Sequence, residues 1–288
     1  MTTLPAEAVT AAALHRELRK EGFAIVRNVA SPGLITRIDD DLAEDFRTTR
    51  PSEGHFYGAA TTRFGRILAR SRAAQELLAQ PLLLALPRLL LEWHQAIQLD
   101  FTQAIAVHPG ARAQPPHRDG EMWPVPPYEG EHLINLLFPL SRFTADNGAT
   151  HVWARSHRGA EGMAADPIPA LMQPGDVLAF LGSTLHGQGE NRSSQERRAL
   201  AVGYSAAWLR ASENQALAYP PLVARLFPEE VRGLAGYRRI APNLNNFDCR
   251  CPSELVSMSH AGAVDLLHPQ QAAALEQRYG RLPTARDG

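Results

Sequence analysis

Two histidines and one aspartate are the residues of this sequence best suited to chemistry. One residue separates His117 from Asp119, and His186 follows far downstream. Side chains at positions i and i+2 of a strand point to the same face, so His117 and Asp119 can bind one ion. Two imidazoles and one carboxylate are the ligand set that holds non-haem iron(II) and leaves coordination positions open. Without thiolates, this set favours iron or manganese over a closed structural zinc site.

A lone His-x-Asp triplet is also typical of a surface loop, and the chain has 11 histidines. The context favours a site, because His117 follows an alternating apolar run and His186 follows the strand-like residues 176–180. Arg197 begins a further strand-like segment, and its planar guanidinium suits bidentate pairing with a carboxylate. Arg198 points to the opposite strand face and is the alternative if the register shifts by one residue.

Together these segments resemble the phytanoyl-CoA dioxygenase family of iron(II)- and 2-oxoglutarate-dependent oxygenases. The similarity extends over most of the chain, from residues 21–26 to residues 208–214. It includes Asp146-Asn-Gly-Ala-Thr150 and Ser156-His157. The chain has Ala154-Arg155 where many members have Pro-Gly, which bears on the geometry of that turn and not on the metal site.

The resemblance implies roles for individual residues. It implies that His117, Asp119 and His186 bind the iron. It implies that Arg197 pairs with the distal carboxylate of 2-oxoglutarate and that Gln114 is a second contact to it. Further candidates for the co-substrate pocket are Gln188 and Thr150. Candidates for the substrate pocket, each of which could instead pack under a loop, are Met122, Trp123, Tyr57 with its neighbour Phe56, and Tyr128.

The implied reaction consumes O2 and 2-oxoglutarate and gives succinate and CO2, while the protein orients the target C–H bond. Halogenating relatives carry a small residue where this chain has Asp119, so the resemblance implies hydroxylation or another oxygen-type outcome. We expect a small or medium specialised metabolite as substrate, because no cluster marks a coenzyme A site. Two other functions stay open: a metal-binding jelly roll without turnover, and a zinc-dependent hydrolase with a general base beside the metal.

Composition limits the partners and the compartment. With 29 basic and 30 acidic residues, the formal net charge is -1, which gives no reason to expect nucleic acid or an anionic membrane as partner. Cys249 and Cys251 are too close for an ordinary disulfide, which fits a reducing compartment. Prolines interrupt the leucine-rich residues 77–91, so they predict a buried helix rather than a membrane span of about 20 residues. The N-terminus lacks a secretory-signal pattern. We expect a cytoplasmic enzyme, either monomer or homodimer.

The order of elements predicts the fold. Many short strands separated by turns, preceded by helices, predict a mainly β fold with helical cover. The family resemblance implies that its core is a double-stranded β-helix, a cupin-like jelly roll. No repeat or linker divides the chain, so residues 1–288 are expected to form one domain. Helices are predicted over residues 5–21, 31–47, 214–233 and 270–279, with two short ones ending near 93, and strands over residues 23–29, 95–107, 132–140, 149–154, 176–180 and 197–208.

Overall fold

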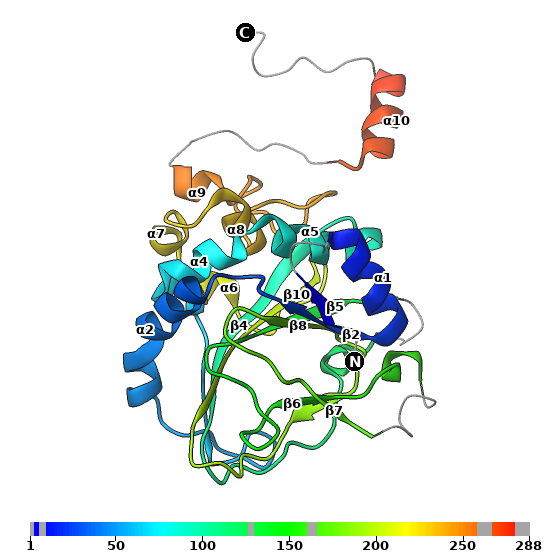
Figure 1. Cartoon of the computed structure of the whole chain (residues 1–288). Helices are drawn as coiled ribbons and strands as arrows, with labels where there is room; N and C mark the ends of the chain where they lie inside the picture. Colours follow the sequence, from blue (N-terminus) through cyan, green and yellow to red (C-terminus); the bar gives the residue numbers. More distant parts are fainter. Residues whose placement is uncertain (1–2, 6–9, 126–129, 160–165, 258–266, 280–288) are drawn as a thin grey trace.

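The computed structural model describes residues 3–5, 10–125, 130–159, 166–257 and 267–279. Most of them form a large sheet, a small sheet and a layer of helices (Figure 1). Within these residues, no helix combines the length and the apolar character that crossing a membrane requires.

Most of the helices cover the outer face of the large sheet (Figure 1). α1 (Ala11–Glu21) begins at Thr10, whose side chain accepts a hydrogen bond from the N–H of Ala13, and it ends at Gly22 with φ of 85°. Ser31 caps α2 (Pro32–Thr48) in the same way, with Pro32 at the first helical position as predicted. The other helices are α3 (Ile67–Arg70), α4 (Arg72–Leu78), α5 (Pro81–Leu90), α6 (Gln215–Ala218), α7 (Pro221–Ala224), α8 (Glu229–Leu234), α9 (Glu254–Ser257) and α10 (Pro269–Tyr279), with single 3₁₀ turns η2 (Glu92–His94), η3 (Asp119–Met122) and η4 (Ser156–Arg158).

Two sheets form the β core. The large sheet has the order β1-β2-β8-β5-β10-β4-β3 and the small one β7-β6-β9. All neighbours pair antiparallel except β1 and β2, which are parallel. The strands are β1 (Thr3–Pro5), β2 (Phe23–Arg27), β3 (Thr61–Phe64), β4 (Ile97–Val107), β5 (Leu133–Pro139), β6 (Thr150–Val152), β7 (Ile168–Pro169), β8 (Val177–Leu181), β9 (His186–Gln188) and β10 (Arg197–Ala206).

Strict alternation along the central strands separates two apolar layers. In β8, Val177 and Ala179 belong to the core under the helices, whereas Leu178 and Phe180 belong to the core that includes residues of the small sheet. In β10, Leu200 lies on the helix side, and Ala199 lies on the inner side. Side chains of successive strand residues point to opposite faces, so odd-numbered residues at the start of β10 face the space between the sheets. The predicted jelly-roll core with helical cover is confirmed.

Three element predictions were wrong. Pro5, expected to begin the helix over residues 5–21, instead ends β1, which pairs with β2, and α1 begins at Ala11. Residues 61–64, for which no strand was predicted, form the edge strand β3, which pairs with β4. The single helix expected over residues 214–233 is three short helices, because Pro220 and Pro228 interrupt it and each precedes a new helix.

Candidate metal centre and co-substrate pocket

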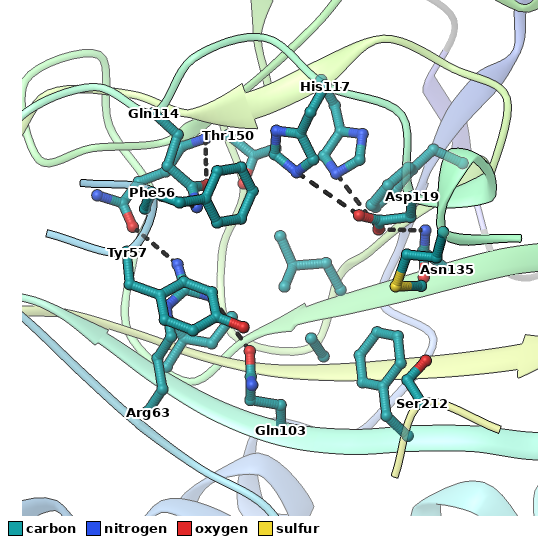
Figure 2. Close-up of a pocket in the computed structure, with 18 of the residues that line it drawn as sticks. Phe56, Tyr57, Arg63, Gln103, Gln114, His117, Asp119, Asn135, Thr150 and Ser212 are labelled. Atoms are coloured by element: carbon teal, nitrogen blue, oxygen red, sulfur yellow. Dashed lines mark hydrogen bonds and ion pairs between the residues drawn. The ribbon is translucent and has the colours of Figure 1, made fainter. Parts of the chain in front are cut away.

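The two histidines and the aspartate meet at one end of the space between the sheets. His117 and His186 exchange both backbone hydrogen bonds, N to O at 2.9 and 3.0 Å, so their rings lie side by side with centroids 4.3 Å apart. Asp119 begins η3 and turns back toward them. Its Oδ1 lies 3.5 Å from His117 Nε2 and its Oδ2 lies 3.5 Å from His186 Nε2. The donor atoms of all three residues lie within 4.8 Å of one another (Figure 2).

Backbone carbonyls fix the orientation of both imidazoles. His117 Nδ1 lies 3.0 Å from the carbonyl oxygen of Pro115, and His186 Nδ1 lies 3.0 Å from that of Thr184. An Nδ1–H that donates to a carbonyl leaves the lone pair on Nε2. Both Nε2 atoms face Asp119, so two nitrogens and a carboxylate converge without a thiolate, and this donor set fits iron(II).

The three groups shift one another's pKa values. Burial lowers the pKa of His117, and the neighbouring His186 lowers it further. Burial also acts to lower the pKa of His186, but the Asp119 carboxylate outweighs it and the pKa lies above its ordinary value. For Asp119, burial acts to raise the pKa, yet the two histidines and a hydrogen bond from Asn135 bring it below its ordinary value. The carboxylate is therefore held as an anion between two imidazoles, which suits a divalent cation.

Arg197 is a buried cation that faces the same cavity. It is 2% exposed, and its carbon Cζ lies 4.4 Å from the ring centroid of Phe143. One Nη donates to the carbonyl oxygen of Gly148 at 2.6 Å, while Nε is buried with no hydrogen-bond partner among the described residues. Burial and the nearby charge of Arg63 lower the pKa of Arg197 to about 9. A buried guanidinium with an unused N–H is suited to an anionic ligand.

Arg63 is a second cation in this cavity, partly buried, and no pattern in the sequence selects it. Its Nη atoms donate to Gln103 Oε1 at 3.1 Å and to Gln188 Oε1 at 3.3 Å, and its guanidinium lies over the ring of Tyr57 (Figure 2). Burial lowers the pKa of Arg63 to about 10. Two arginines thus face one cavity, and within the part of the chain that the structure describes, the three oxygens that accept from them belong to uncharged groups.

One cavity of about 550 Å³ joins the metal residues to the arginines. Its apolar wall includes Phe101, Ile105, Leu137 and Phe180. This volume exceeds what a five-carbon diacid fills and leaves room for part of a second molecule. The cavity therefore combines a metal-binding end, a cationic end and an apolar wall.

Most of the predicted site residues line this cavity. Gln114 Oε1 accepts from the backbone N–H of Gln188 at 3.2 Å, and Gln114 Nε2 donates to the carbonyl oxygen of Phe56. Thr150, Gln188, Tyr57 and Met122 also line it. Trp123 is not part of the lining, and its indole N–H donates to the carbonyl oxygen of Arg210. Tyr128 lies outside the described residues.

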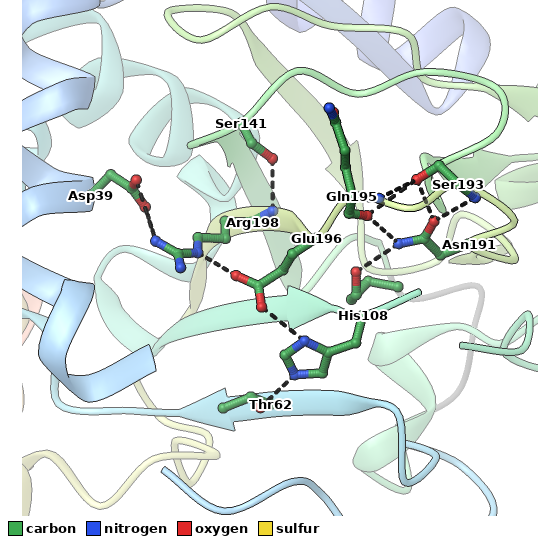
Figure 3. Close-up of polar contacts among 10 residues, drawn as sticks. Asp39, Thr62, His108, Ser141, Asn191, Ser193, Gln195, Glu196 and Arg198 are labelled. Atoms are coloured by element: carbon green, nitrogen blue, oxygen red, sulfur yellow. Dashed lines mark hydrogen bonds and ion pairs between the residues drawn. The ribbon is translucent and has the colours of Figure 1, made fainter. Parts of the chain in front are cut away.

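A network of charged groups surrounds the start of β10, on either side of Arg197. Glu196 pairs with His108 Nδ1 at 2.8 Å and with Arg198, and Arg198 pairs with Asp39 of α2 at 3.3 Å (Figure 3). His108 Nε2 lies 2.8 Å from the hydroxyl of Thr62 in β3. These contacts tie the start of β10 to β3 and α2, while the backbone pairing of β10 with β4 and β5 fixes its register.

Some features of the cavity were not predicted, and the sequence carries a different amount of local signal for each of them. Asn135 is the only polar residue in the run 133–139, and a single amide in an apolar strand is a sequence signal of a functional contact. Phe56 was a candidate together with Tyr57, but its edge-on contact with His117, with ring centroids 4.7 Å apart, was not predicted. Nothing in the sequence around Arg63 marks it, because its role depends on the pairing of β3 with β4.

Known proteins resemble the chain in sequence and in fold. The model of the family "Phytanoyl-CoA dioxygenase (PhyH)" matches residues 18–199. The dioxygenase aneA of Aspergillus aculeatus is 33% identical over 218 residues, which cover 68% of this chain and 73% of that protein. The multifunctional dioxygenase ausE of Aspergillus calidoustus is 29% identical over 259 residues, covering 82% and 85%.

Among solved structures, the epimerase SnoN from nogalamycin biosynthesis, in complex with Fe3+, alpha ketoglutarate and nogalamycin RO, gives a TM-score of 0.58. It is 14% identical and covers 68% of this chain and 84% of its own. HygX from Streptomyces hygroscopicus, with nickel and 2-oxoglutarate bound, gives 0.56 at 16% identity, covering 72% and 91%. These two similarities show the fold.

The fold and the site define a jelly-roll oxygenase with a two-histidine, one-carboxylate centre. The chain belongs to the phytanoyl-CoA dioxygenase family. The predicted class, an oxidoreductase that acts as an iron(II)- and 2-oxoglutarate-dependent dioxygenase, is confirmed.

Proposed function

We propose that this dioxygenase binds iron(II) through His117, Asp119 and His186 and oxidises a small or medium specialised metabolite. The observation that carries the proposal is that these residues share one cavity with Arg197, a buried guanidinium with an unused N–H. Bound iron(II), with O2 and 2-oxoglutarate, supplies the oxidising chemistry and leaves succinate and CO2 as co-products.

Other residues of the cavity bind the co-substrate and exclude water. Arg197 binds the distal carboxylate of 2-oxoglutarate, and Arg63 adds a second positive charge at that end of the cavity. Gln114, Thr150 and Gln188 supply polar contacts along the co-substrate. The buried inner wall excludes water, which strengthens each charged contact.

The substrate occupies the part of the cavity that 2-oxoglutarate leaves free, and Phe101, Met122 and the 56–57 segment are among its lining. One solved structure of similar fold, the epimerase SnoN, holds nogalamycin RO, and this supports a natural product as substrate. The outcome of oxidation, whether hydroxylation or another, is set by which C–H bond the cavity presents. Free thiols at Cys249 and Cys251 support a reducing compartment such as the cytoplasm.

Anaerobic titration tests the proposal. Purified protein given iron(II) and then 2-oxoglutarate should develop the metal-to-ligand absorption band of the chelated 2-oxo acid. With O2 and ascorbate, it should then release succinate slowly without any substrate. A metal-binding protein without turnover would bind iron and release no succinate, and a zinc hydrolase would show no band. Either result, with iron fully loaded, would overturn the proposed function.

A further inference from the structure

One polar side chain interrupts an apolar strand beneath the metal residues. β5 has the sequence Leu-Ile-Asn-Leu-Leu-Phe-Pro, and all of its residues are buried. Asn135 is 3% exposed, and its side chain lines the cavity. A buried amide is costly unless it forms hydrogen bonds. An apolar side chain would be the ordinary choice here, so the amide calls for a specific partner.

That partner is the carboxylate of the metal triad. Asn135 Nδ2 donates to Asp119 Oδ2 at 2.9 Å (Figure 2). The same oxygen lies 3.5 Å from His186 Nε2, and the other carboxylate oxygen lies 3.5 Å from His117 Nε2. The amide therefore restrains Asp119 in the orientation that faces both imidazoles. A neutral donor does so without adding a positive charge that would compete with a metal ion.

The strand register extends this support to a second member of the triad. Asn135 lies directly opposite Phe180 of β8, and residues opposite each other in an antiparallel pair project from the same face. The ring of Phe180 packs against His186, with centroids 4.5 Å apart. On its other side Asn135 pairs with Gly203 of β10. The ring of Phe101 lies over that glycine, where a Cβ atom would come within 2.5 Å of it.

The amide oxygen of Asn135 shows that this polar side chain has an energetic cost. Asn135 Oδ1 is buried and has no hydrogen-bond partner among the described residues. An unpaired buried acceptor destabilises a fold, whereas an apolar isostere would not. Packing alone would thus favour leucine at position 135. The single hydrogen bond to Asp119 is the feature that leucine lacks.

We propose that Asn135 is a positioning residue of the metal centre, which holds Asp119 toward His117 and His186 through its Nδ2–H. The inference rests on the proposed function, in which Asp119 is a ligand. Groups that hydrogen-bond to metal ligands fix the ligand orientation, and their loss weakens metal affinity or activity by about 10- to 100-fold.

Cobalt(II) binding measures this role without any turnover. Asn135→Leu should weaken Co2+ affinity at least about tenfold and alter the visible d–d absorption of the bound ion. Asn135→Ser makes a smaller change of volume, is too short to replace the amide, and should act in the same direction. Gln75→Leu is the matched control, because Gln75 is a buried amide of α4 that donates to the carbonyl oxygen of Leu68. It should lower the melting temperature and leave cobalt binding unchanged.

A double-mutant cycle tests whether Asn135 acts through Asp119. In an Asp119→Gly background, Asn135→Leu should cause no further loss of cobalt affinity, because the restrained group is absent. If the two losses add, or if Asn135→Leu and Asn135→Ser bind cobalt like the wild type, the proposal is overturned while the proposed function stands. A wild-type protein that binds neither cobalt nor 2-oxoglutarate would instead overturn the proposed function itself.

Discussion

Arg197 and Arg198 are neighbours in β10, yet their guanidinium groups lie on opposite faces of the large sheet. Arg197 lies over the ring of Phe143, between the two sheets. Arg198 lies over the ring of Phe46 in α2, with 4.6 Å from Cζ to the centroid, and pairs with Asp39. The pleat of a strand makes this division unavoidable. Of this pair, only Arg197 lines the cavity with the metal residues.

Arg197→Leu should therefore weaken binding of 2-oxoglutarate. The change removes a charge-assisted pair and leaves a desolvated carboxylate on the co-substrate, a loss of about 2–5 kcal/mol. Because about 1.4 kcal/mol corresponds to one decade, the Michaelis constant for 2-oxoglutarate should rise at least about tenfold. The rate of succinate release as a function of 2-oxoglutarate concentration measures it.

Arg198→Leu is the matched control for this prediction. Burial raises the pKa of Asp39, and Arg198 opposes that rise, so the variant leaves Asp39 without this counter-charge. It should lower the free energy of unfolding by about 1 kcal/mol, since the pair is partly exposed. The Michaelis constant for 2-oxoglutarate should stay unchanged. A tenfold rise in Arg198→Leu, with none in Arg197→Leu, would contradict the register of β10.

Removing a metal ligand should abolish turnover without unfolding the protein. His117→Ala and His186→Ala should release no succinate and should bind Co2+ at least about a hundredfold more weakly, a change of about 2.7 kcal/mol. The core lies mainly in apolar layers away from the triad, so circular dichroism should stay native. Asp119→Gly should also stop succinate release. Native-level release from any one variant would remove that residue from the ligand set.

The sequence predicts the site best where local spacing is enough. Side chains two positions apart in extended chain share a face, so His117 and Asp119 could be paired before any fold was known. Arg197 required the register of one strand, and the family resemblance, not the local pattern, selected it over Arg198. Arg63 required the pairing of β3 with β4, two strands whose contact no local pattern announces. The contact of Phe56 with His117 could not be predicted for the same reason, because it joins residues that are far apart in the sequence.

The fold followed the same rule. Ser31-Pro32 and Gly22 marked helix ends through their own backbone preferences, and both ends were correct to within a residue. β1 and β3 were missed because they are short edge strands, which are defined by their partners rather than by their own sequence.

Arg63→Leu should have opposite effects on stability and on affinity. In the free protein Arg63 and Arg197 repel each other, since the charge of Arg63 lowers the pKa of Arg197. Removing one of the two neighbouring cations should raise the melting temperature of the metal-free protein. It should also weaken 2-oxoglutarate binding about tenfold, as an anionic ligand loses about 1.4 kcal/mol of attraction. Anaerobic titration measures the second effect.

Arg70→Leu serves as control, because Arg70 forms a partly exposed ion pair with Asp45 outside the cavity lining. It should leave 2-oxoglutarate affinity unchanged and should not raise the melting temperature. An Arg63→Leu variant that binds 2-oxoglutarate like the wild type would show that Arg63 has a structural role only.

Phe56→Ala should make the metal more accessible to solvent. The ring of Phe56 stands edge-on against His117, and its backbone carbonyl is held by Gln114 Nε2 at 3.2 Å. Gly54 and Gly58 flank the segment with φ of 87° and 77°, so the ring is carried by a tight turn over the metal residues. An apolar shell limits the access of water to a metal site. Loss of the ring should therefore speed extraction of bound Co2+ by a chelator about three- to tenfold, or about 0.7–1.4 kcal/mol in the barrier. Stopped-flow absorbance of the cobalt form measures this rate.

Leu222→Ala, on the exposed side of α7, should leave the rate unchanged. If Phe56→Ala loses cobalt no faster than that control, the aromatic segment does not cover the metal in solution.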